Sequence, residues 1–347
     1  MKRLKQIQSI LSENMINIGK LSNICWNGIP PDNNKIRALC WKYLLGIYPT
    51  NKELQQSIVK KKKEEYILMC NDYSKALSDP DKVMNDQELG IYRQILKDVP
   101  RTMPEYPMFQ SEKIKKMMTR LLYIWSMRHP ASGYVQGFND LTTPFFVVYF
   151  LEFFEGCTLD QLLVKNFDEA QDITDDNFID IETDIYFSLT KLLDRIQTHY
   201  TNNQPGLKEM MENMKNLIQK VDPELSNLLE KKEVEYIQFS FRWMNCFLMR
   251  EFPINLILRL WDTYFSEENS FRDFHFYVCS SLLLSFSKQL KKMTEFQEMI
   301  LFLQKLPTNS WEEKDIEVLL AKSYQIREIY SNFFKKKNEN TMKNNKK

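Results

Sequence analysis

Apolar residues recur every three or four positions along most of this chain, which is the spacing of one face of an α-helix. The first clear example starts at Ile36 and ends at Gly46, a residue type that stops helices. Another follows Ser111, which can cap a helix, and continues to Trp125 before Pro130 interrupts it. No segment alternates convincingly between apolar and polar residues with period two. The pattern therefore predicts an all-α fold.

The second half of the chain carries more helix signals. Capping residues and helix-opening prolines mark four further predicted starts, at Asp222-Pro223-Glu224, Pro253, Thr294 and Ser310. Between the first two, an apolar stripe at helical spacing runs from Val234 to Leu248. No unit of 30 to 50 residues is repeated, which argues against a helical solenoid.

Three stretches depart from the amphipathic pattern. Lys60 to Lys63 is a four-lysine run in a long polar helix, and we interpret it as a solvated face. Asp160 to Asp184 carries nine acidic residues and one lysine, which indicates an exposed connection or an acidic surface loop. The tail over 335–347 has six lysines and no apolar run, so the segment 331–347 is predicted to be disordered.

The charge and glycine content exclude several classes of protein. Lysine and arginine number 47 against 46 acidic residues, and this balance argues against a broad nucleic-acid-binding surface. Only 8 of the 347 residues are glycine, about a third of the average usage. Few glycines disfavour a sheet-rich fold with many tight turns, and they leave little material for phosphate-binding loops.

The six cysteines are scattered and contain no C-x-x-C pair, which is typical of core cysteines in a reducing compartment. Only three histidines are available, so we expect no metal site. The segment 1–10 has no apolar run of signal-peptide length, and Leu141 to Phe154 is too short to span a bilayer. We therefore expect a soluble cytoplasmic protein.

Common enzyme signatures are missing. The sequence has no Walker loop, no G-x-G-x-x-G, no G-x-S-x-G and no H-E-x-x-H. We accordingly expect no nucleotide or other cofactor bound by the chain itself.

One candidate for chemistry is the segment 95–107, which has three prolines in eight positions. Proline fixes φ and removes a donor, so this segment cannot form a helix interior and displays Arg101 from a stiff loop. Asp98 could pair with the guanidinium and fix its direction. A rigid arginine suits the charge that develops on a phosphate, because its planar fork provides directed donors. The alternative is an ordinary surface Asp–Arg pair in a proline-rich turn.

The second candidate is the segment 132–140, in which Gly133 and Gly137 flank Gln136. Glycine lets the backbone approach a partner closely, and a glutamine amide both donates and accepts. Such an amide can hold a water molecule for attack without titrating. The alternative is a helix start with Asn139 and Asp140 as local caps.

Together the two segments resemble a known family. Ile95-x-x-Asp98-x-x-Arg101, followed about 35 residues later by Tyr134-x-Gln136-Gly137, resembles the paired signature of the TBC domain, the GTPase-activating domain that acts on Rab GTPases. Further stretches agree in order: Gly28-Ile29-Pro30 with Arg37 and Trp41, Phe241-Arg242-Trp243, Arg250-Glu251-Phe252-Pro253, and Leu260-Trp261-Asp262. The runs 129–137 and 241–245 look most like the member twenty-two branch of that family.

The resemblance implies a two-lobed helical TBC domain over 24–330, with lobes of about 24–205 and 206–330. Residues 1–23 would form an N-terminal helical extension. The large aromatic and arginine residues of the other motifs, Arg37, Trp41, Arg242, Trp243 and Trp261, would be fold residues.

The resemblance also implies a mechanism. Arg101 would neutralise charge on the γ-phosphoryl group of a GTP-bound Rab, and Gln136 would orient the attacking water. Asp98, Tyr134 and Gly137 would support these two side chains. The chain would thus supply catalytic residues in trans without hydrolysing a nucleotide itself, and GTP and Mg²⁺ would belong to the Rab.

Two rival functions differ in chemistry. A helical adaptor would keep the fold and bind Rab or trafficking partners without accelerating hydrolysis. A membrane-surface protein would use its lysine tail to bind anionic lipid. Intact Arg101 and Gln136 favour the GTPase activator over both rivals. A Rab activator is expected to act in vesicle trafficking. Its expected location is the cytoplasm, with peripheral association with Golgi or other endomembranes. Neither the particular Rab nor an oligomeric state is encoded in these motifs.

Overall fold

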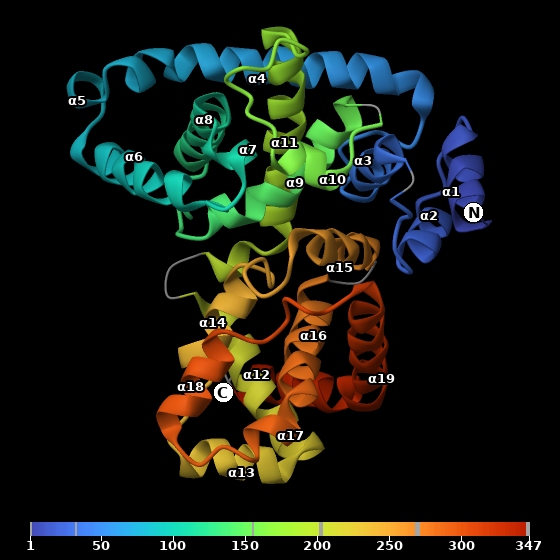
Figure 1. The fold of residues 1–347 in the computed structure, drawn as a ribbon, viewed down its shortest axis with the longest axis vertical. Helices are drawn as coiled ribbons and strands as arrows, with labels where there is room; N and C mark the ends of the chain where they lie inside the picture. The colour runs from blue at the N-terminus through green and yellow to red at the C-terminus, as the bar shows by residue number, and fades with distance from the viewer. Residues whose placement is uncertain (1, 32, 155, 201–203, 268–270, 345–347) are drawn as a thin grey trace. The chain divides into compact units, whose positions relative to one another are not determined.

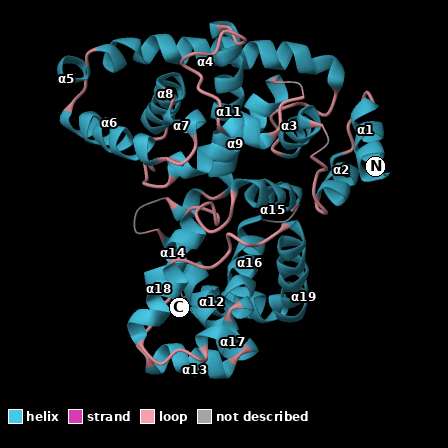
Figure 2. Cartoon of the chain, in the orientation of Figure 1, coloured by secondary structure: helices cyan, strands magenta, loops and turns pink. Residues whose placement is uncertain are grey.

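The computed structural model describes residues 2–31, 33–154, 156–200, 204–267 and 271–344, with side chains as far as Ser331. Every regular element in these ranges is a helix, apart from one isolated bridge between Met15 and Asn51 (Figure 2). The prediction of an all-α fold is therefore confirmed. The chain divides into two compact units, residues 1–202 and 203–347. The predicted domain and lobe limits remain predictions.

The N-terminal unit holds eleven α-helices and three short 3₁₀ helices in its described part (Figure 1). They are α1 (Lys2–Ser12), α2 (Ile18–Cys25), α3 (Asn34–Leu44), η1 (Lys52–Leu54), α4 (Gln55–Ser78), α5 (Pro80–Val83), α6 (Asp86–Asp98), η2 (Val99–Arg101), α7 (Pro107–Gln110), α8 (Glu112–Arg128), α9 (Phe138–Phe153), α10 (Leu159–Leu163), α11 (Asp175–Arg195) and η3 (Gln197–His199).

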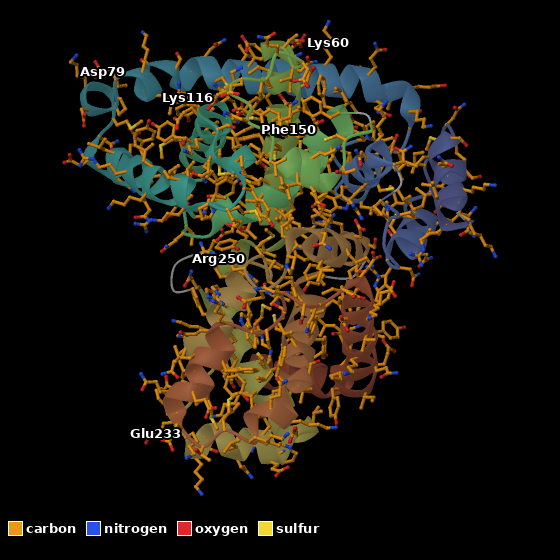
Figure 3. All side chains as sticks on the ribbon, viewed as in Figure 1. Lys60, Asp79, Lys116, Phe150, Glu233 and Arg250 are labelled. Atoms are coloured by element: carbon orange, nitrogen blue, oxygen red, sulfur yellow. The ribbon has the colours of Figure 1, made fainter. Side chains whose placement is uncertain are left out.

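Helix α9 is the core of this unit. Every residue from Phe138 to Leu151 is buried, as expected for a helix that is apolar on all sides. It packs against α3, α8, α10 and α11, and Figure 3 shows its Phe150 in the interior of the unit. Pro144 cannot donate to the carbonyl of Asp140, and the Thr143 hydroxyl donates to that carbonyl instead at 2.8 Å. A proline is thus tolerated inside a buried helix.

The C-terminal unit holds eight α-helices in its described part. They are α12 (Pro205–Val221), α13 (Pro223–Lys231), α14 (Ile237–Asn245), α15 (Ile254–Ser266), α16 (Phe271–Ser285), α17 (Ser287–Leu290), α18 (Phe296–Gln304) and α19 (Glu313–Asn344). The predicted helix starts at Asp222-Pro223 and Pro253 are confirmed by α13 and α15. The stripe from Val234 to Leu248 is helical only over α14.

Helix α16 is central to this unit and packs against α12, α14, α15 and α19. Its buried His275 is paired on both ring nitrogens: the Tyr264 hydroxyl lies 2.7 Å from Nδ1 of His275, and Nε2 of His275 lies 3.2 Å from the Trp243 carbonyl oxygen. Trp243 and Trp261 are buried, as is Trp41 in the other unit. The prediction that these tryptophans are fold residues is confirmed.

Arg242 also serves the fold, because it joins two of the sequence motifs. Its guanidinium donates to both carboxylate oxygens of Glu251, at 2.7 and 3.0 Å, and to the Gln304 carbonyl at 2.7 Å. Glu251 is buried, so this bidentate pair satisfies a charge that water does not reach.

The acidic stretch over 160–184 is not simply an exposed loop: this prediction was wrong for residues 160–163, which lie in α10, and for the second half of the stretch. Residues from Asp175 onward form the start of α11, because Thr174 and Asn177 make a capping box and Asp175 and Asp176 suit the first turn of a helix. Asp168, in the connection before it, accepts from the backbone N–H groups of Glu112 and Lys113, at 2.8 and 2.9 Å, and so caps α8.

Four acids of α11 pair with basic residues of neighbouring helices. Glu182 is fully buried and accepts from Arg120 and from the Tyr66 hydroxyl, the latter at 2.6 Å. Lys63, in the lysine run that we interpreted as solvated, pairs with Asp176 and Asp180 at 2.8 and 2.7 Å. The prediction of a solvated face holds for Lys60, which is exposed and whose side chain points outward in Figure 3.

Helix α19 continues to Asn344 and so passes through most of the segment predicted to be disordered. Lysine and glutamate are good helix formers, and the segment extends a helix whose first half is anchored by packing on α16. Residues 345–347 lie outside the described residues. None of the described helices is long and apolar enough to cross a membrane.

A buried ion cluster joins three helices of the N-terminal unit. Lys42 of α3 is 3% exposed, and its ammonium lies 2.7 Å from Glu152 of α9 and 2.6 Å from Asp184 of α11. Burial alone would lower the pKa of Lys42, but the charges of Asp184 and Glu152 outweigh it and raise that pKa well above its usual value. The ammonium is therefore a fixed positive charge at the junction.

Lys42→Met should destabilise the unit by about 3 kcal/mol, because it leaves two poorly solvated carboxylates facing each other. Lys63→Met is the matched control, since Lys63 also pairs with two acids of α11 but these are half-exposed or more, and it should cost less than about 1 kcal/mol. The measurement is the free energy of unfolding from urea denaturation. An equal decrease in the free energy of unfolding for the two variants would show that the buried Lys42 cluster stabilises the unit no more than the exposed Lys63 pairs do.

Candidate functional site

Arg101 lies at the end of η2, in the loop that follows α6. The α-helix ends at Asp98 because Pro100 cannot extend it, and the chain makes one 3₁₀ turn before Thr102 becomes extended. Arg101 is exposed and has no hydrogen bond or ion pair with any described residue. Arg101 is exposed as predicted, but the expectation that 95–107 is non-helical was wrong: residues 95–98 end α6, and Arg101 itself lies in the 3₁₀ turn.

Gln136 lies in the loop between α8 and α9. The chain reverses at His129, whose carbonyl accepts from Gly133 N–H at 2.8 Å, and then reaches α9 through Gly137. Gly133 has φ +59° and Gly137 has φ +107°, conformations that favour glycine. Gln136 is exposed. Asn139 is not the local cap that the alternative interpretation proposed, since Gly137 is the N-cap of α9 and Asn139 is buried in its first turn.

The loops that carry Arg101 and Gln136 are joined through Tyr134 and Asp98. The Tyr134 hydroxyl donates to Oδ2 of Asp98 at 3.0 Å, across 36 residues of sequence. Burial, and then the charge of Asp98, raise the pKa of Tyr134 far above its usual value, so the phenol remains a neutral donor. The Tyr134 ring also packs edge-on against Phe138 at 5.8 Å.

A second link joins the same two loops. Nδ2 of Asn139 donates to Oγ1 of Thr102 at 2.9 Å, and the Thr102 hydroxyl donates to the Asp98 carbonyl oxygen at 3.2 Å. Thr102 and Asn139 are each 1% exposed. Exposed Arg101 is followed directly by buried Thr102, and exposed Gln136 is followed three residues later by buried Asn139. The two buried residues hydrogen-bond to each other.

The predicted pair between Asp98 and Arg101 is not formed. Asp98 is 4% exposed, and its carboxylate accepts from Tyr134 and from Nε2 of Gln94 at 3.1 and 3.2 Å. Because α6 turns this carboxylate inward, Arg101 three residues later points elsewhere. Asp98 therefore supports the loop by binding Tyr134 rather than by holding the guanidinium.

Sequence reasoning missed the parts played by Thr102 and Asn139. The signal available was a polar residue directly after Arg101 and another three residues after Gln136, in the first turn of an apolar helix. It does not identify the partner, because the two residues lie 37 positions apart.

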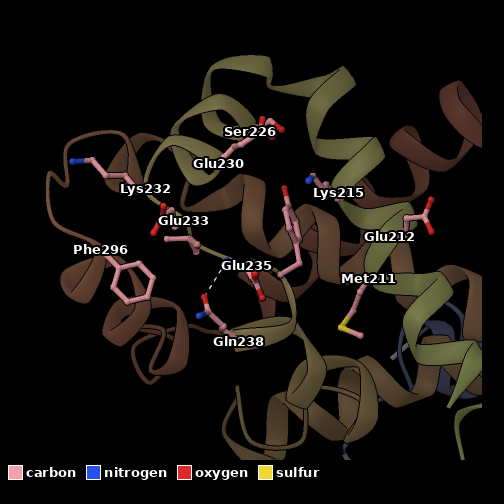
Figure 4. Close-up of a pocket in the computed structure, with 12 residues that line it drawn as sticks. Met211, Glu212, Lys215, Ser226, Glu230, Lys232, Glu233, Glu235, Gln238 and Phe296 are labelled. Carbon is pink, nitrogen blue, oxygen red and sulfur yellow. Dashed lines mark hydrogen bonds between the residues drawn. The ribbon is translucent and has the colours of Figure 1, made fainter. Parts of the chain in front are cut away.

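Neither a metal-ligand cluster nor the pocket of the C-terminal unit involves these loops. Among the described residues, no group of three or more histidine, cysteine, aspartate or glutamate side chains could hold a metal ion. A pocket of about 1030 Å³ lies within the C-terminal unit, between α12, α13, α14 and α18. Figure 4 shows Phe296 and Glu212 on opposite sides of it, and Figure 3 shows Glu233 at the outer edge of the same unit. None of the predicted site residues lines it.

The chain as a whole is similar to known proteins. The sequence pattern of the Rab-GTPase-TBC domain matches residues 34–291, about three quarters of the chain. The chain belongs to this family. The TBC segment contains all five predicted site residues, Asp98, Arg101, Tyr134, Gln136 and Gly137.

Relatives of this TBC protein match over almost its whole length. GTPase-activating protein gyp1 of Schizosaccharomyces pombe is 41% identical over 333 residues, and TBC1 domain family member 22B of Homo sapiens is 38% identical over 329 residues. Each alignment covers 95% of this chain and 62% of the relative. The predicted family and its member twenty-two branch are confirmed, and the chain spans less than two thirds of the length of these relatives.

A solved structure agrees with the fold. The crystal structure of the Ypt/Rab-GAP domain of Gyp1p superposes with a TM-score of 0.86 at 38% identity, and the match covers 95% of this chain and 98% of that one. The TBC fold predicted from the motifs is therefore confirmed.

Two glycines of the N-terminal unit should respond in opposite ways to alanine. Gly137→Ala should destabilise the domain by about 1–3 kcal/mol, because φ +107° is strained for any residue with a Cβ. Gly90→Ala should stabilise it by up to about 1 kcal/mol, because Gly90 lies inside α6 and an added Cβ meets nothing within 4 Å. Urea denaturation of both variants gives the sign of each change. A neutral Gly137→Ala variant would contradict the assigned backbone conformation of the loop.

Proposed function

We propose that this TBC domain is a GTPase-activating protein for a Rab GTPase, to which it supplies Arg101 and Gln136 in trans. The observation that carries the proposal is that these two exposed side chains stand on loops whose buried residues are bonded to each other. The printed names of the relatives support the same activity, since gyp1 of Schizosaccharomyces pombe is a GTPase-activating protein.

Arg101 would act on charge. As the γ-phosphoryl group transfers, negative charge spreads over its oxygens, and a guanidinium offers two directed donors to them. An arginine supplied in trans is worth about 10³–10⁵ in rate, which is roughly 4–7 kcal/mol of transition-state stabilisation. Arg101 has no ion pair within the described chain, so no internal contact has to be broken before it engages the phosphate.

Gln136 would act on the nucleophile. An amide holds a water molecule through its carbonyl oxygen and keeps the same charge at every physiological pH. Phosphoryl transfer requires mainly positioning and charge stabilisation, and two side chains held on rigid loops can supply both. On this proposal GTP and Mg²⁺ belong to the Rab, and the chain needs no cofactor of its own.

The expected setting is part of the same proposal. The partner would be a Rab in its GTP-bound form. A place in the cytoplasm, at the surface of Golgi or other endomembranes, follows from a Rab partner in vesicle traffic.

Single-turnover GTP hydrolysis by a panel of Rabs tests the proposal. Arg101→Ala should lower the stimulated rate at least about 10³-fold, and Arg101→Lys should lose most of it, since lysine lacks the planar fork. Gln136→Ala should also lose most of the stimulation. Binding of GTP-loaded Rab should persist in all three variants, because the lost interactions are made in the transition state.

Arg93→Ala is the control, because Arg93 is an exposed arginine of α6 whose partner Asp81 lies outside the two loops. It should keep the wild-type rate. If Arg101→Ala is as active as wild type on every responsive Rab, the assignment of Arg101 is wrong. A wild-type protein that binds a Rab without accelerating hydrolysis would instead identify an adaptor.

A further inference from the structure

The hydrogen bond between Asn139 and Thr102 joins the segment of Arg101 directly to the segment of Gln136. Thr102 follows Arg101 in sequence, and Asn139 comes three residues after Gln136. Both side chains are almost completely buried, so the bond is shielded from competing water.

We propose that Thr102 and Asn139 are positioning residues that hold the loops of Arg101 and Gln136 in one fixed arrangement. The inference rests on the proposed function, and it concerns residues that touch neither the Rab nor its nucleotide. They act through the two displayed side chains, whose loops they lock together.

The hydrogen-bond directions support this role. The Thr102 hydroxyl has one proton, which it gives to the carbonyl oxygen of Asp98 at the end of α6. Its oxygen is then an acceptor for Nδ2 of Asn139, and Oδ1 of Asn139 lies 3.3 Å from the Tyr134 hydroxyl. The four residues Asp98, Thr102, Asn139 and Tyr134 therefore form a closed ring of contacts.

The ring also has a rigid foundation. Asn139 belongs to α9, in which every residue from Phe138 to Leu151 is buried. A shift of the Asn139 backbone would require a shift of this core helix, so Thr102 is tied to the buried core of the unit. Arg101, which has no partner of its own, takes its position from that tie.

Such a tie matters for rate more than for binding. Arg101 has to meet the phosphoryl group while Gln136 holds the water that attacks it, and a misplacement of about 1 Å can cost about 10²-fold in rate. Looser loops still allow a Rab to dock, since docking uses a whole surface. Loss of the bond should therefore lower kcat and leave KM for GTP-loaded Rab nearly unchanged.

Thr102→Val tests the inference, because valine keeps the shape of threonine and removes only the oxygen. We expect kcat to fall by 10- to 100-fold, with KM within about twofold of wild type. Thr102→Ser, which restores the hydroxyl, should recover most of kcat. Thr183→Val is the matched control: Thr183 is also buried, and its hydroxyl donates at 2.7 Å to the Ile179 carbonyl within α11, away from the loops. This control should keep kcat within about twofold.

Hydrogen exchange of the free protein provides a second readout that does not depend on any Rab. Thr102→Val should speed amide exchange in 133–138, a segment that contains no substitution, and Thr183→Val should not. Asn139→Ala, which breaks the bond from its other side, should speed exchange in 99–103 and serves if Thr102→Val fails to fold. Faster exchange confined to the segment that carries the substitution would overturn the proposal.

The two measurements also separate the two hypotheses. If wild type accelerates no Rab, the proposed function fails, and the exchange data still decide whether Thr102 and Asn139 couple the loops. If wild type is active and Thr102→Val retains its kcat, the positioning role is wrong and the proposed function stands.

Discussion

The N-terminal unit depends on one constraint: α9 is buried on all sides, so each polar group at its start must find a partner inside the protein. Asn139 satisfies this requirement with Thr102, and Tyr134, in the loop before α9, is paired with Asp98. An unpaired buried polar group costs about 1–3 kcal/mol, so burial of the helix selects these partners. These hydrogen bonds fix the geometry of the two loops that carry Arg101 and Gln136.

Charge in the core follows the same rule. The acidic stretch over 160–184 neutralises Lys42 and Arg120 and caps the start of α8. Breaking one side of a buried pair leaves an uncompensated charge, which is why such pairs resist substitution even when their net contribution to stability is small. The segment that reads as surface in sequence is thus one of the main internal supports of the unit.

Local signals predicted the elements well, and long-range partners poorly. The helices at Ile36, Ser111 and Pro253 could be predicted because their apolar spacing and end signals lie within a few residues of one another. The partner of Asp98 could not, since the i, i+3 spacing suggested Arg101 while the true partner, Tyr134, is 36 positions away. The acidic stretch was misread for the same reason, because composition records charge but not the basic side chains that α4, α8 and α3 bring to it.

The displayed residues were easier to predict than their supports, and physics explains the difference. Prolines around Arg101 and glycines around Gln136 are local restrictions on the backbone, so they are visible in the sequence itself. The residues that hold these loops are ordinary threonine, asparagine and aspartate, whose role depends entirely on what the fold places opposite them. A non-catalytic adaptor would need a docking surface but no fixed relation between two exposed side chains. The closed ring that joins the loops of Arg101 and Gln136 supplies that fixed relation, which the proposed catalytic function requires and an adaptor does not.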